Sequence, residues 1–444
     1  MNAQLSTKLP SAGTLVLLGG ICLAAAIALA YAFRRRRELF PLLAVATLPL
    51  RLPITTGGRT VNLLIPLYIV ILAGIIAGML PWPRAVFGGR GSWWRPPRAR
   101  TVAILLAATI VLYALQATYS TEPKKAVENL VFFYIPFGLM FAMLLQLRWD
   151  RRLLLRCLYV SVGLAAIFVA IGLVEEATSS LLLNAKLVAS NEYQGYFRVN
   201  SVFYDPNIYG RFLALVMIGV MAGVLWTNSP RVVRAGAAAL AWLLVGLVTS
   251  FSQSSMAALL LGLAVLAAWR WSLRRTVTVA AAAAVAVLAL IVLAPASFHF
   301  GLKGTGGSVS TTTNGRSKLA SGGLRIFRER PLFGYGSGSF ERQYRAGESA
   351  AELSTSVSAS HTTPVTVAAE QGLIGLAVYV VTLVAALLVL FRGARGSPER
   401  MAIAAAFAAL VLHTWTYADY LEDPFTWALL AVGCALSRGA ADSV

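Results

Sequence analysis

The stretch 363-TPVTVAAEQGLIGLAVYVVTLVAALLVLF-391 is a long apolar run that contains a single charged residue, Glu370. A helix needs about 17–25 mainly apolar residues to cross the ~30 Å hydrocarbon core of a membrane, and this run is long enough. Comparable runs recur along nearly the whole chain, whereas the alternating strands of about ten residues that build membrane barrels do not. The sequence therefore predicts an all-α protein, a polytopic transmembrane helical bundle.

The composition supports a membrane protein, with 58% hydrophobic and only 13% charged residues. A net charge of +20 would suggest a nucleic-acid partner in a soluble protein. Most arginines here lie in short loops between apolar runs, where positive charge sets membrane orientation. We therefore expect membrane lipids, and no nucleic acid, as partners. The three cysteines share no close spacing and indicate neither a disulfide framework nor a metal site: Cys22, Cys157 and Cys434.

The apolar runs, read against the basic loops, predict about 12–13 spans. The first run has no small-residue cleavage site and is followed by 34-RRRR-37, so we expect a retained helix rather than a removed signal. If the spans alternate, the arginine-rich loops all fall on one side, which the positive-inside rule makes cytoplasmic. The predicted spans are 13–33, 38–53, 61–80, 101–118, 128–147, 153–174, 207–226, 233–249, 255–270, 276–296, 363–391, 401–418 and 424–437.

Two long polar segments fall on the outer side, and long loops in compact proteins tend to carry function. We expect the larger loop to be partly helical, with an interfacial helix within 316–331 whose Leu319, Leu324 and Phe327 face lipid or protein. The predicted organisation is N-terminal transmembrane helices at 1–174, a first outer loop at 175–206, middle transmembrane helices at 207–296, a large outer loop at 297–362 and C-terminal transmembrane helices at 363–444.

The outer loops are basic where the positive-inside rule does not require it. The planar, permanently charged guanidinium suits phosphate oxygens, and two arginines from different loops could hold a diphosphate at the membrane surface. Attraction to anionic headgroups is the alternative for such a cluster. The basic residues concerned are Arg198, Arg316, Lys318, Arg325, Arg328, Arg330, Arg342 and Arg345.

Of the three histidines, His361 alone lies at the outer mouth beside the basic loop. A neutral imidazole, with a pKa near ~6.5, is suited to accept a proton from a hydroxyl nucleophile. The alternative is a polar residue at a membrane interface. We expect His413 to form hydrogen bonds inside the bundle. Asp205 and Asn207 begin a predicted span, where helix capping is a stronger expectation than catalysis. The outer acidic residues show no D-x-D spacing, so no metal site is predicted.

Three segments resemble the O-antigen ligase and O-antigen polymerase superfamily. The segment 198-RVNSVFYDPNIYG-210 is similar to the family's arginine before an Asp/Asn-Pro-Asn helix start. The segment 316-RSKLASGGLRIFRERPLFGYGSGSF-340 resembles its arginine followed, fifteen residues on, by a Pro-Leu-hydrophobic-Gly-x-Gly turn. The segment 361-HTTPVTVAAEQGLIG-375 resembles its histidine leading to Glu-x-Gly-Leu-Ile-Gly.

The resemblance implies a GT-C-like fold and a metal-independent, inverting glycosyltransferase that uses no cofactor. A glycan would pass from a polyprenyl-diphosphate donor, such as undecaprenyl diphosphate, to an acceptor hydroxyl. The site would face the periplasm, at the outer face of the bacterial cytoplasmic (inner) membrane. By this resemblance His361 is the catalytic base, and Arg198 and Arg316 bind the donor diphosphate. The supporting residues would be Arg325, Arg328, Asn207 and Tyr335.

The expected activity is that of an O-antigen ligase of lipopolysaccharide biosynthesis, with lipid A-core as the acceptor. The alternatives within the family are a polysaccharide polymerase, whose acceptor is a growing glycan, and a protein O-oligosaccharyltransferase. The sequence departs from the family pattern at Gln253, Ala320, Thr362 and Pro364. From other classes, a transporter is the main rival, although few ionisable residues beyond His413 and Arg211 lie within spans. A channel or scaffold would leave the basic outer loop unexplained.

Overall fold

The computed structural model describes residues 12–56, 59–80, 99–182, 197–271, 316–347 and 360–439. Within these ranges the chain is helical, apart from one antiparallel hairpin that pairs β1 (Leu52–Thr56) with β2 (Arg59–Leu63). The predicted all-α class is therefore confirmed. The predicted span at 276–296 and large parts of both outer loops lie outside the described residues.

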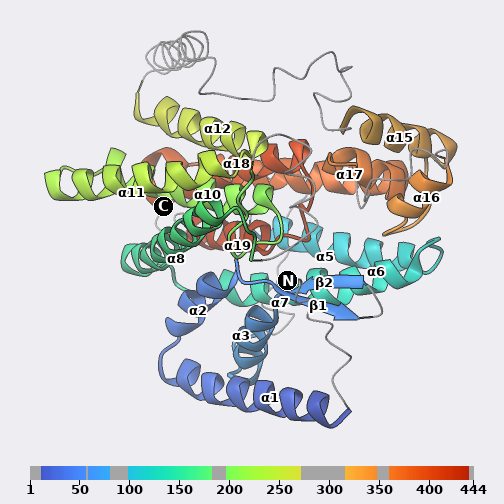
Figure 1. Cartoon of the computed structure of the whole chain (residues 1–444), viewed down its shortest axis with the longest axis horizontal. Coiled ribbons are helices and arrows are strands. Elements are labelled where there is room, and N and C mark those ends of the chain that lie inside the picture. Colours follow the sequence, from blue (N-terminus) through green and yellow to red (C-terminus); the bar gives the residue numbers. More distant parts are fainter. Residues whose placement is uncertain are drawn as a thin grey trace.

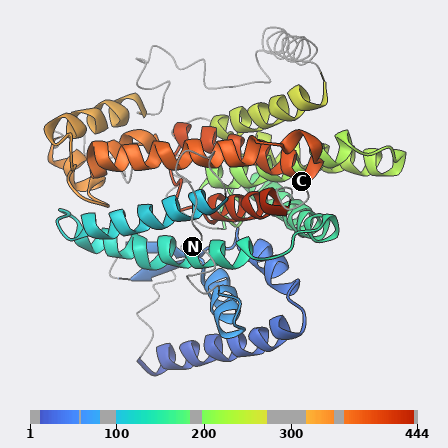
Figure 2. The same cartoon turned by 180° about the vertical axis from the view of Figure 1, so that it is seen from behind.

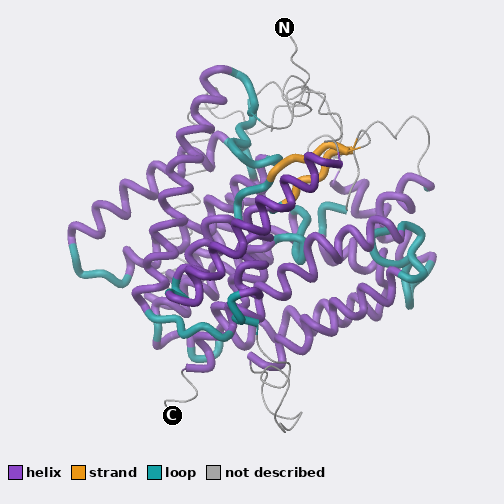
Figure 3. Tube along the Cα trace, turned by 90° about the horizontal axis from the view of Figure 1, so that it is seen from below, coloured by secondary structure: helices purple, strands orange, loops and turns teal. Residues whose placement is uncertain are grey.

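The helices form one bundle, in which most long helices run across the view of Figure 1, and α15 and α16 lie together beside α17 at one end. Figure 2 shows the same arrangement from behind, and Figure 3 shows the hairpin at the edge of the bundle. The helices are α1 (Ala12–Arg35), α2 (Leu39–Thr47), α3 (Ile65–Ile76), α5 (Ala99–Ala117), α6 (Pro123–Asn129), α7 (Ile135–Leu145), α8 (Arg151–Thr178), α10 (Pro206–Leu225), α11 (Pro230–Thr249), α12 (Gln253–Arg270), α15 (Arg316–Glu329), α16 (Phe340–Ala346), α17 (Thr363–Phe391), α18 (Pro398–Thr416) and α19 (Pro424–Gly439).

Eight helices in the described ranges are long and apolar enough to cross a membrane. Each coincides with a predicted span, which makes the chain a multi-pass membrane protein by length and composition. They are α1, α5, the continuous segment Pro123–Leu145 that contains α6 and α7, α8, α10, α11, α12 and α17. The helix α8 continues to Thr178, so the predicted boundary at 174 falls within a helix.

The predicted span at 38–53 is wrong. The helix α2 has only nine residues, and the chain then enters β1. The helix ends at Thr47 with Leu48 as its C-cap, and Pro49 follows directly, which has no N–H to continue the helical hydrogen bonds. The segment 54-ITTGGRTV-61 also places Gly-Gly between β-branched residues, a signal for a tight hairpin. For the same reason α3 has only 12 residues and starts after β2, inside the predicted span 61–80.

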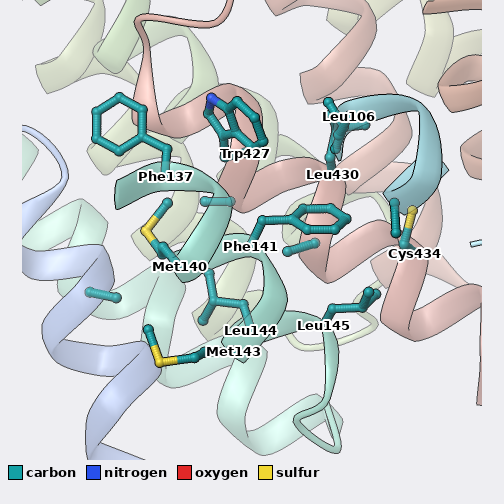
Figure 4. Close-up of a cluster of buried hydrophobic side chains, with 14 of the residues drawn as sticks. Leu106, Phe137, Met140, Phe141, Met143, Leu144, Leu145, Trp427, Leu430 and Cys434 are labelled. Atoms are coloured by element: carbon teal, nitrogen blue, oxygen red, sulfur yellow. The ribbon is translucent and has the colours of Figure 1, made fainter. Parts of the chain in front are cut away.

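The two largest hydrophobic clusters among the described residues hold the bundle together. In the first, Phe137, Phe141 and neighbouring residues of α7 pack against Trp427 and Leu430 of α19 (Figure 4). The rings of Phe141 and Trp427 lie edge to face, with centroids 6.4 Å apart, an arrangement that aromatic quadrupoles favour. The second cluster joins α8, α10, α11, α12 and α18. Since α18 packs against α10, α12, α17 and α19, it connects the two clusters.

The alternating helices give the bundle two chemically different ends. At the arginine-rich end, Arg151 at the start of α8 pairs with Glu399 at the start of α18, at 3.6 Å. At the opposite end, which we name the site end, α10, α12 and α17 begin, and α8, α11 and α18 finish. Contacts join these termini: the Val199 N–H donates to the Thr249 carbonyl at 3.2 Å, and the Thr363 hydroxyl donates to the Thr414 carbonyl at 2.9 Å.

Candidate functional site

Arg198 lies at the site end in an extended segment that Glu175 anchors. The Glu175 carboxylate, at the end of α8, accepts backbone hydrogen bonds from Asn200 at 3.3 Å and from Ser201 at 2.6 Å. Ser201 has a φ of 53°, which non-glycine residues seldom adopt. This anchoring fixes the backbone two residues beyond Arg198, and sequence reasoning did not identify it.

The Arg198 guanidinium binds two elements of the site end. Its Nη2 donates to Asn207 Oδ1 at 3.2 Å, and its Nε donates to the Ser250 carbonyl at 3.2 Å. Asn207 also accepts a hydrogen bond at 3.0 Å from Ser252 Oγ. Asn207 therefore holds Arg198 at the start of α10, and its role toward a donor stays a prediction.

Asp205 caps α10, as the sequence predicted, because its carboxylate accepts the Asn207 backbone N–H at 2.6 Å. The same side chain is hydrogen-bonded to Tyr417, a buried residue of the loop after α18. Burial raises the pKa of the Tyr417 hydroxyl well above its ordinary value, so this hydroxyl stays protonated and donates to Asp205.

Tyr417 also lies between two histidines. Its ring centroid is 5.4 Å from that of His361 and 5.7 Å from that of His413. His361 itself has a φ of 54° and directly precedes Thr362, the N-cap of α17. Tyr417 therefore connects the predicted base to the segment that holds Arg198. The aromatic stretch 414-TWTYADY-420 is visible in the sequence as a candidate part of the site. Its contact with His361 is visible only in the structure.

His413 is fully buried and bonds inside the bundle, as predicted. Its Nε2 lies 3.1 Å from Ser255 Oγ and 3.3 Å from Ser254 Oγ. Both serines belong to 252-SQSS-255, where the family pattern has a basic residue in place of Gln253. Ser252 caps α12 and is 2.7 Å from Ser255 Oγ. A chain of polar contacts thus runs from Asn207 through these serines to His413.

Arg316 opens α15, the predicted helix of the large outer loop. This helix packs closely on its neighbours because of Gly322 and Gly323. A Cβ at Gly322 would collide with the Tyr344 ring, and a Cβ at Gly323 would collide with Val365 and lie 3.6 Å from Ser360. The two glycines, which argue against a helix in isolation, here allow α15 to approach the start of α17. The helix that begins with Arg316 therefore lies beside the residue that precedes His361.

The helix α15 buries one face against protein. Ile326 is buried with Phe340 and Ala369, and Leu319 packs against them, whereas Leu324 is 43% exposed. Leu324 therefore does not pack against this cluster, and its predicted contact with lipid stays a prediction. The stripe buried against protein follows the helical repeat from Leu319 to Ile326, seven residues apart.

The turn 331-PLFGYGSGSF-340 and the kink in α17 form one packed unit. Glu370, buried in α17, accepts backbone hydrogen bonds from Gly338 at 2.8 Å and Phe340 at 3.1 Å. Gly372 has a φ of 66° within α17, and the freed Leu373 N–H donates to the Pro331 carbonyl at 2.7 Å. Glu370 therefore holds the turn against α17. The contact also explains why a Gly-x-Gly turn and a Glu-x-Gly helix occur together.

The remaining predicted supporting residues lie along α15 and its following turn. Arg325 pairs with Glu329 at 3.5 Å and lies against Gly347. The Tyr335 hydroxyl donates to Glu329 at 2.7 Å, and its ring lies 4.5 Å from the Arg330 guanidinium. Arg328 is exposed. These contacts stabilise the end of α15 and its turn, and the roles of the three residues toward a donor stay predictions.

Arg211, the basic residue within a span, forms a buried ion pair. Its Nη2 lies 2.5 Å from Asp423 Oδ2, and each side chain is 1% exposed. Its Nη1 also donates to the Ala418 carbonyl at 3.3 Å. The pair ties α10 to the loop that contains Tyr417. Arg211 therefore has a structural partner, as His413 does, rather than lining an ion pathway as a transporter would require.

Among the described residues, no three His, Cys, Asp or Glu side chains converge as metal ligands would. Metal-independent chemistry stays a prediction. The groups at the site end that could take part in chemistry are thus Arg198, His361 and the protonated Tyr417. The helix that starts with Arg316 lies beside them. Such groups can neutralise an anion and accept a proton from a hydroxyl.

Comparison with known proteins gives one family. Residues 238–380 match the family model described as O-antigen ligase. The matched range includes the start of α12, all of α15, the glycine turn, His361 and the kink in α17. It leaves Arg198 and Asn207 outside. No curated protein matches the chain.

Proposed function

We propose, from the match of residues 238–380 to the O-antigen ligase family and from the geometry of the site end, that this chain transfers a glycan from a polyprenyl-diphosphate donor to an acceptor hydroxyl. The reaction is metal-independent and inverting, and it takes place at the outer face of the cytoplasmic membrane. His361 is the general base. Arg198 and Arg316 bind the diphosphate, and the acceptor is lipid A-core.

One observation carries the proposal. Arg198 and His361 come from distant segments, yet both are tied to the start of α10, Arg198 through Asn207 and His361 through Tyr417 and Asp205. The third member, Arg316, opens a helix that packs beside Ser360. This arrangement supports a common site for three residues that the family resemblance selected separately.

The proposed reaction is a single displacement. His361 accepts the proton of the acceptor hydroxyl while its oxygen attacks the anomeric carbon from the face opposite the diphosphate. The bond between the anomeric carbon and the diphosphate oxygen breaks, and the polyprenyl diphosphate leaves with the electron pair. The leaving group needs charge stabilisation more than protonation, and fixed guanidinium groups provide it without reorganisation.

The test uses the purified protein in lipid nanodiscs with an undecaprenyl-diphosphate-linked glycan and lipid A-core. We expect glycosylated lipid A-core and released undecaprenyl diphosphate in equal amounts, unchanged by a metal chelator. His361→Ala should lower the rate by about 10²–10⁴-fold, and Arg198→Gln by about 10²–10³-fold. Arg231→Gln, at an exposed position in the first turn of α11 and far from the site end, serves as the control and should retain most of the activity.

Each element of the proposal has an outcome that contradicts it. A His361→Ala variant that folds and transfers at the wild-type rate removes the base assignment. Transfer to a growing glycan or a protein hydroxyl, with none to lipid A-core, replaces the ligase by a polymerase or an oligosaccharyltransferase. Movement of the glycan across the membrane without release of undecaprenyl diphosphate would indicate a transporter.

A further inference from the structure

An apolar cavity of about 390 Å³ lies within the bundle between α8, α10, α18, α19 and α2. Aliphatic side chains from four of these helices line most of its wall, among them Leu155, Leu158, Leu215, Ala402 and Leu429. The cavity is within the range of 300–1,000 Å³ typical of small-molecule sites. It reaches the arginine-rich end of the bundle, opposite the proposed transferase site.

We propose that this cavity binds one acyl chain of an anionic phospholipid, whose headgroup lies beside Arg151 at the arginine-rich end. The inference does not depend on the glycosyltransferase reaction, because none of the residues assigned to that reaction lines the cavity.

The length of the cavity fits a lipid tail. Its lining follows α10 from Phe212 to Trp226, about 20 Å along the axis at 1.5 Å per residue. One leaflet occupies about half of the ~30 Å hydrocarbon core. The cavity is therefore deep enough to take a chain from the membrane surface to beyond the midplane.

The mouth has the features of a membrane interface. Trp149 and Trp226 border it together with Arg151 and Glu399. Tryptophan is enriched where the hydrocarbon meets the headgroups, since its ring is apolar and its N–H is polar. A wall that is aliphatic inside and aromatic and charged at the rim matches the order of tail, interface and headgroup in a phospholipid.

The charge around the mouth favours an anionic headgroup. The segments 148-RWDRRLLLR-156 and 392-RGARGSPER-400 supply seven arginines and two acidic residues, Asp150 and Glu399. Arg151 pairs with Glu399 at 3.6 Å and remains 75% exposed, so its guanidinium can also reach a phosphate. Each basic residue near a membrane surface contributes about 1 kcal/mol to binding anionic lipid.

Gly223 is a position of the cavity lining at which an added Cβ meets no steric clash. It lines the cavity, and a Cβ added there meets nothing within 4 Å. Gly163 of α8 is the matched control, because a Cβ there also meets nothing within 4 Å and the residue does not line the cavity. Both glycines lie in helices, so Gly223→Phe and Gly163→Phe have comparable effects on helix propensity.

The experiment titrates the purified full-length protein in detergent with phosphatidylglycerol or phosphatidylethanolamine and counts bound lipids by native mass spectrometry. We expect one tightly held phosphatidylglycerol on the wild type and on Gly163→Phe, and at least a fivefold lower occupancy on Gly223→Phe. Arg151→Gln should reduce the preference for phosphatidylglycerol, and the exposed neighbour Arg152→Gln should change it less.

A second measurement keeps the test independent of protein yield. Phosphatidylglycerol should raise the Tm of the wild type and of Gly163→Phe, because a ligand that binds only the folded state stabilises it. It should not raise the Tm of Gly223→Phe. Equal occupancy on wild type and Gly223→Phe would overturn the cavity as the binding site, and equal affinity for the two lipids would overturn the anionic headgroup.

Discussion

Tyr417 donates a hydrogen bond to Asp205, the residue that caps α10, while its ring lies 5.4 Å from the ring of His361. This relationship joins the loop after α18 to the segment that holds Arg198. It fixes the position of His361, the predicted base, relative to Arg198, the predicted phosphate-binding residue. These two residues lie far apart in the sequence.

We predict that Tyr417→Phe slows glycan transfer without unfolding the protein. The variant keeps the ring beside His361 and loses the hydrogen bond to Asp205, which is worth about 1 kcal/mol, or roughly a fivefold change in rate. Kinetics with varied acceptor should show a lower kcat and a shifted pH profile, at an unchanged acceptor KM. Tyr420→Phe, in the same loop and against Tyr379, is the control. Identical pH profiles for both variants would rule out a positioning role for Tyr417.

We predict that Gly334→Ala destabilises the protein more than Gly393→Ala does. Both glycines have a φ of 66°, so both alanine variants carry the same left-handed strain of about 1–2 kcal/mol. Only at Gly334 would the added Cβ also collide with the backbone carbonyl of Glu370; at Gly393 the nearest atom is 3.4 Å away, at the end of Arg400. Thermal unfolding in detergent measures the difference. Equal losses of Tm would show that close packing of the turn on α17 contributes nothing.

We predict that Arg211→Met lowers stability by about 3–5 kcal/mol, because it leaves the buried Asp423 carboxylate without its cation. The double variant Arg211→Met/Asp423→Asn should recover most of that loss. Asparagine keeps the oxygen that accepts the Phe425 N–H at 2.7 Å and removes the charge. Thermal unfolding of wild type, single and double variants checks this. A double variant no more stable than the single one would contradict the explanation by an unpaired charge.

We predict a loss of stability between about pH 4.5 and pH 7 that depends on Glu422. Burial, reinforced by Asp419, raises the pKa of Glu422 from 4.5 to about 7. A carboxyl with a raised pKa stays protonated in the folded protein after it has ionised in the unfolded chain, so rising pH favours unfolding until the folded pKa is passed. The Tm of the wild type should therefore fall across this interval.

Glu422→Gln isolates that effect. Glutamine keeps the oxygen that accepts from Asn129 Nδ2 at 3.0 Å and does not titrate. The Tm difference between variant and wild type should be small at pH 4.5 and should grow in favour of the variant up to pH 7. A difference that does not change with pH would exclude Glu422 as the source.

The sequence by itself determined the fold class and most of the spans. Length and hydropathy are local properties, and in the part of the chain that the structure describes eight apolar runs form helices long enough to cross a membrane. The prediction at 38–53 was wrong, because hydropathy does not register that Pro49 ends a helix and that the following Gly-Gly pair favours a hairpin. It also selected Arg198, Asn207 and His361, which the structure ties to the same end of the bundle.

Only the tertiary structure decided which residues support that end. Glu175, Tyr417 and Glu370 act on segments far from their own, and no spacing along the chain indicates these contacts. The glycines of α15 show the same limit, since their advantage exists only where Tyr344 and Val365 approach the helix. A local sequence pattern indicates which secondary structure a segment can form. A buried polar group needs a hydrogen-bond partner, and the packing of segments that are distant in the sequence decides which partner it has.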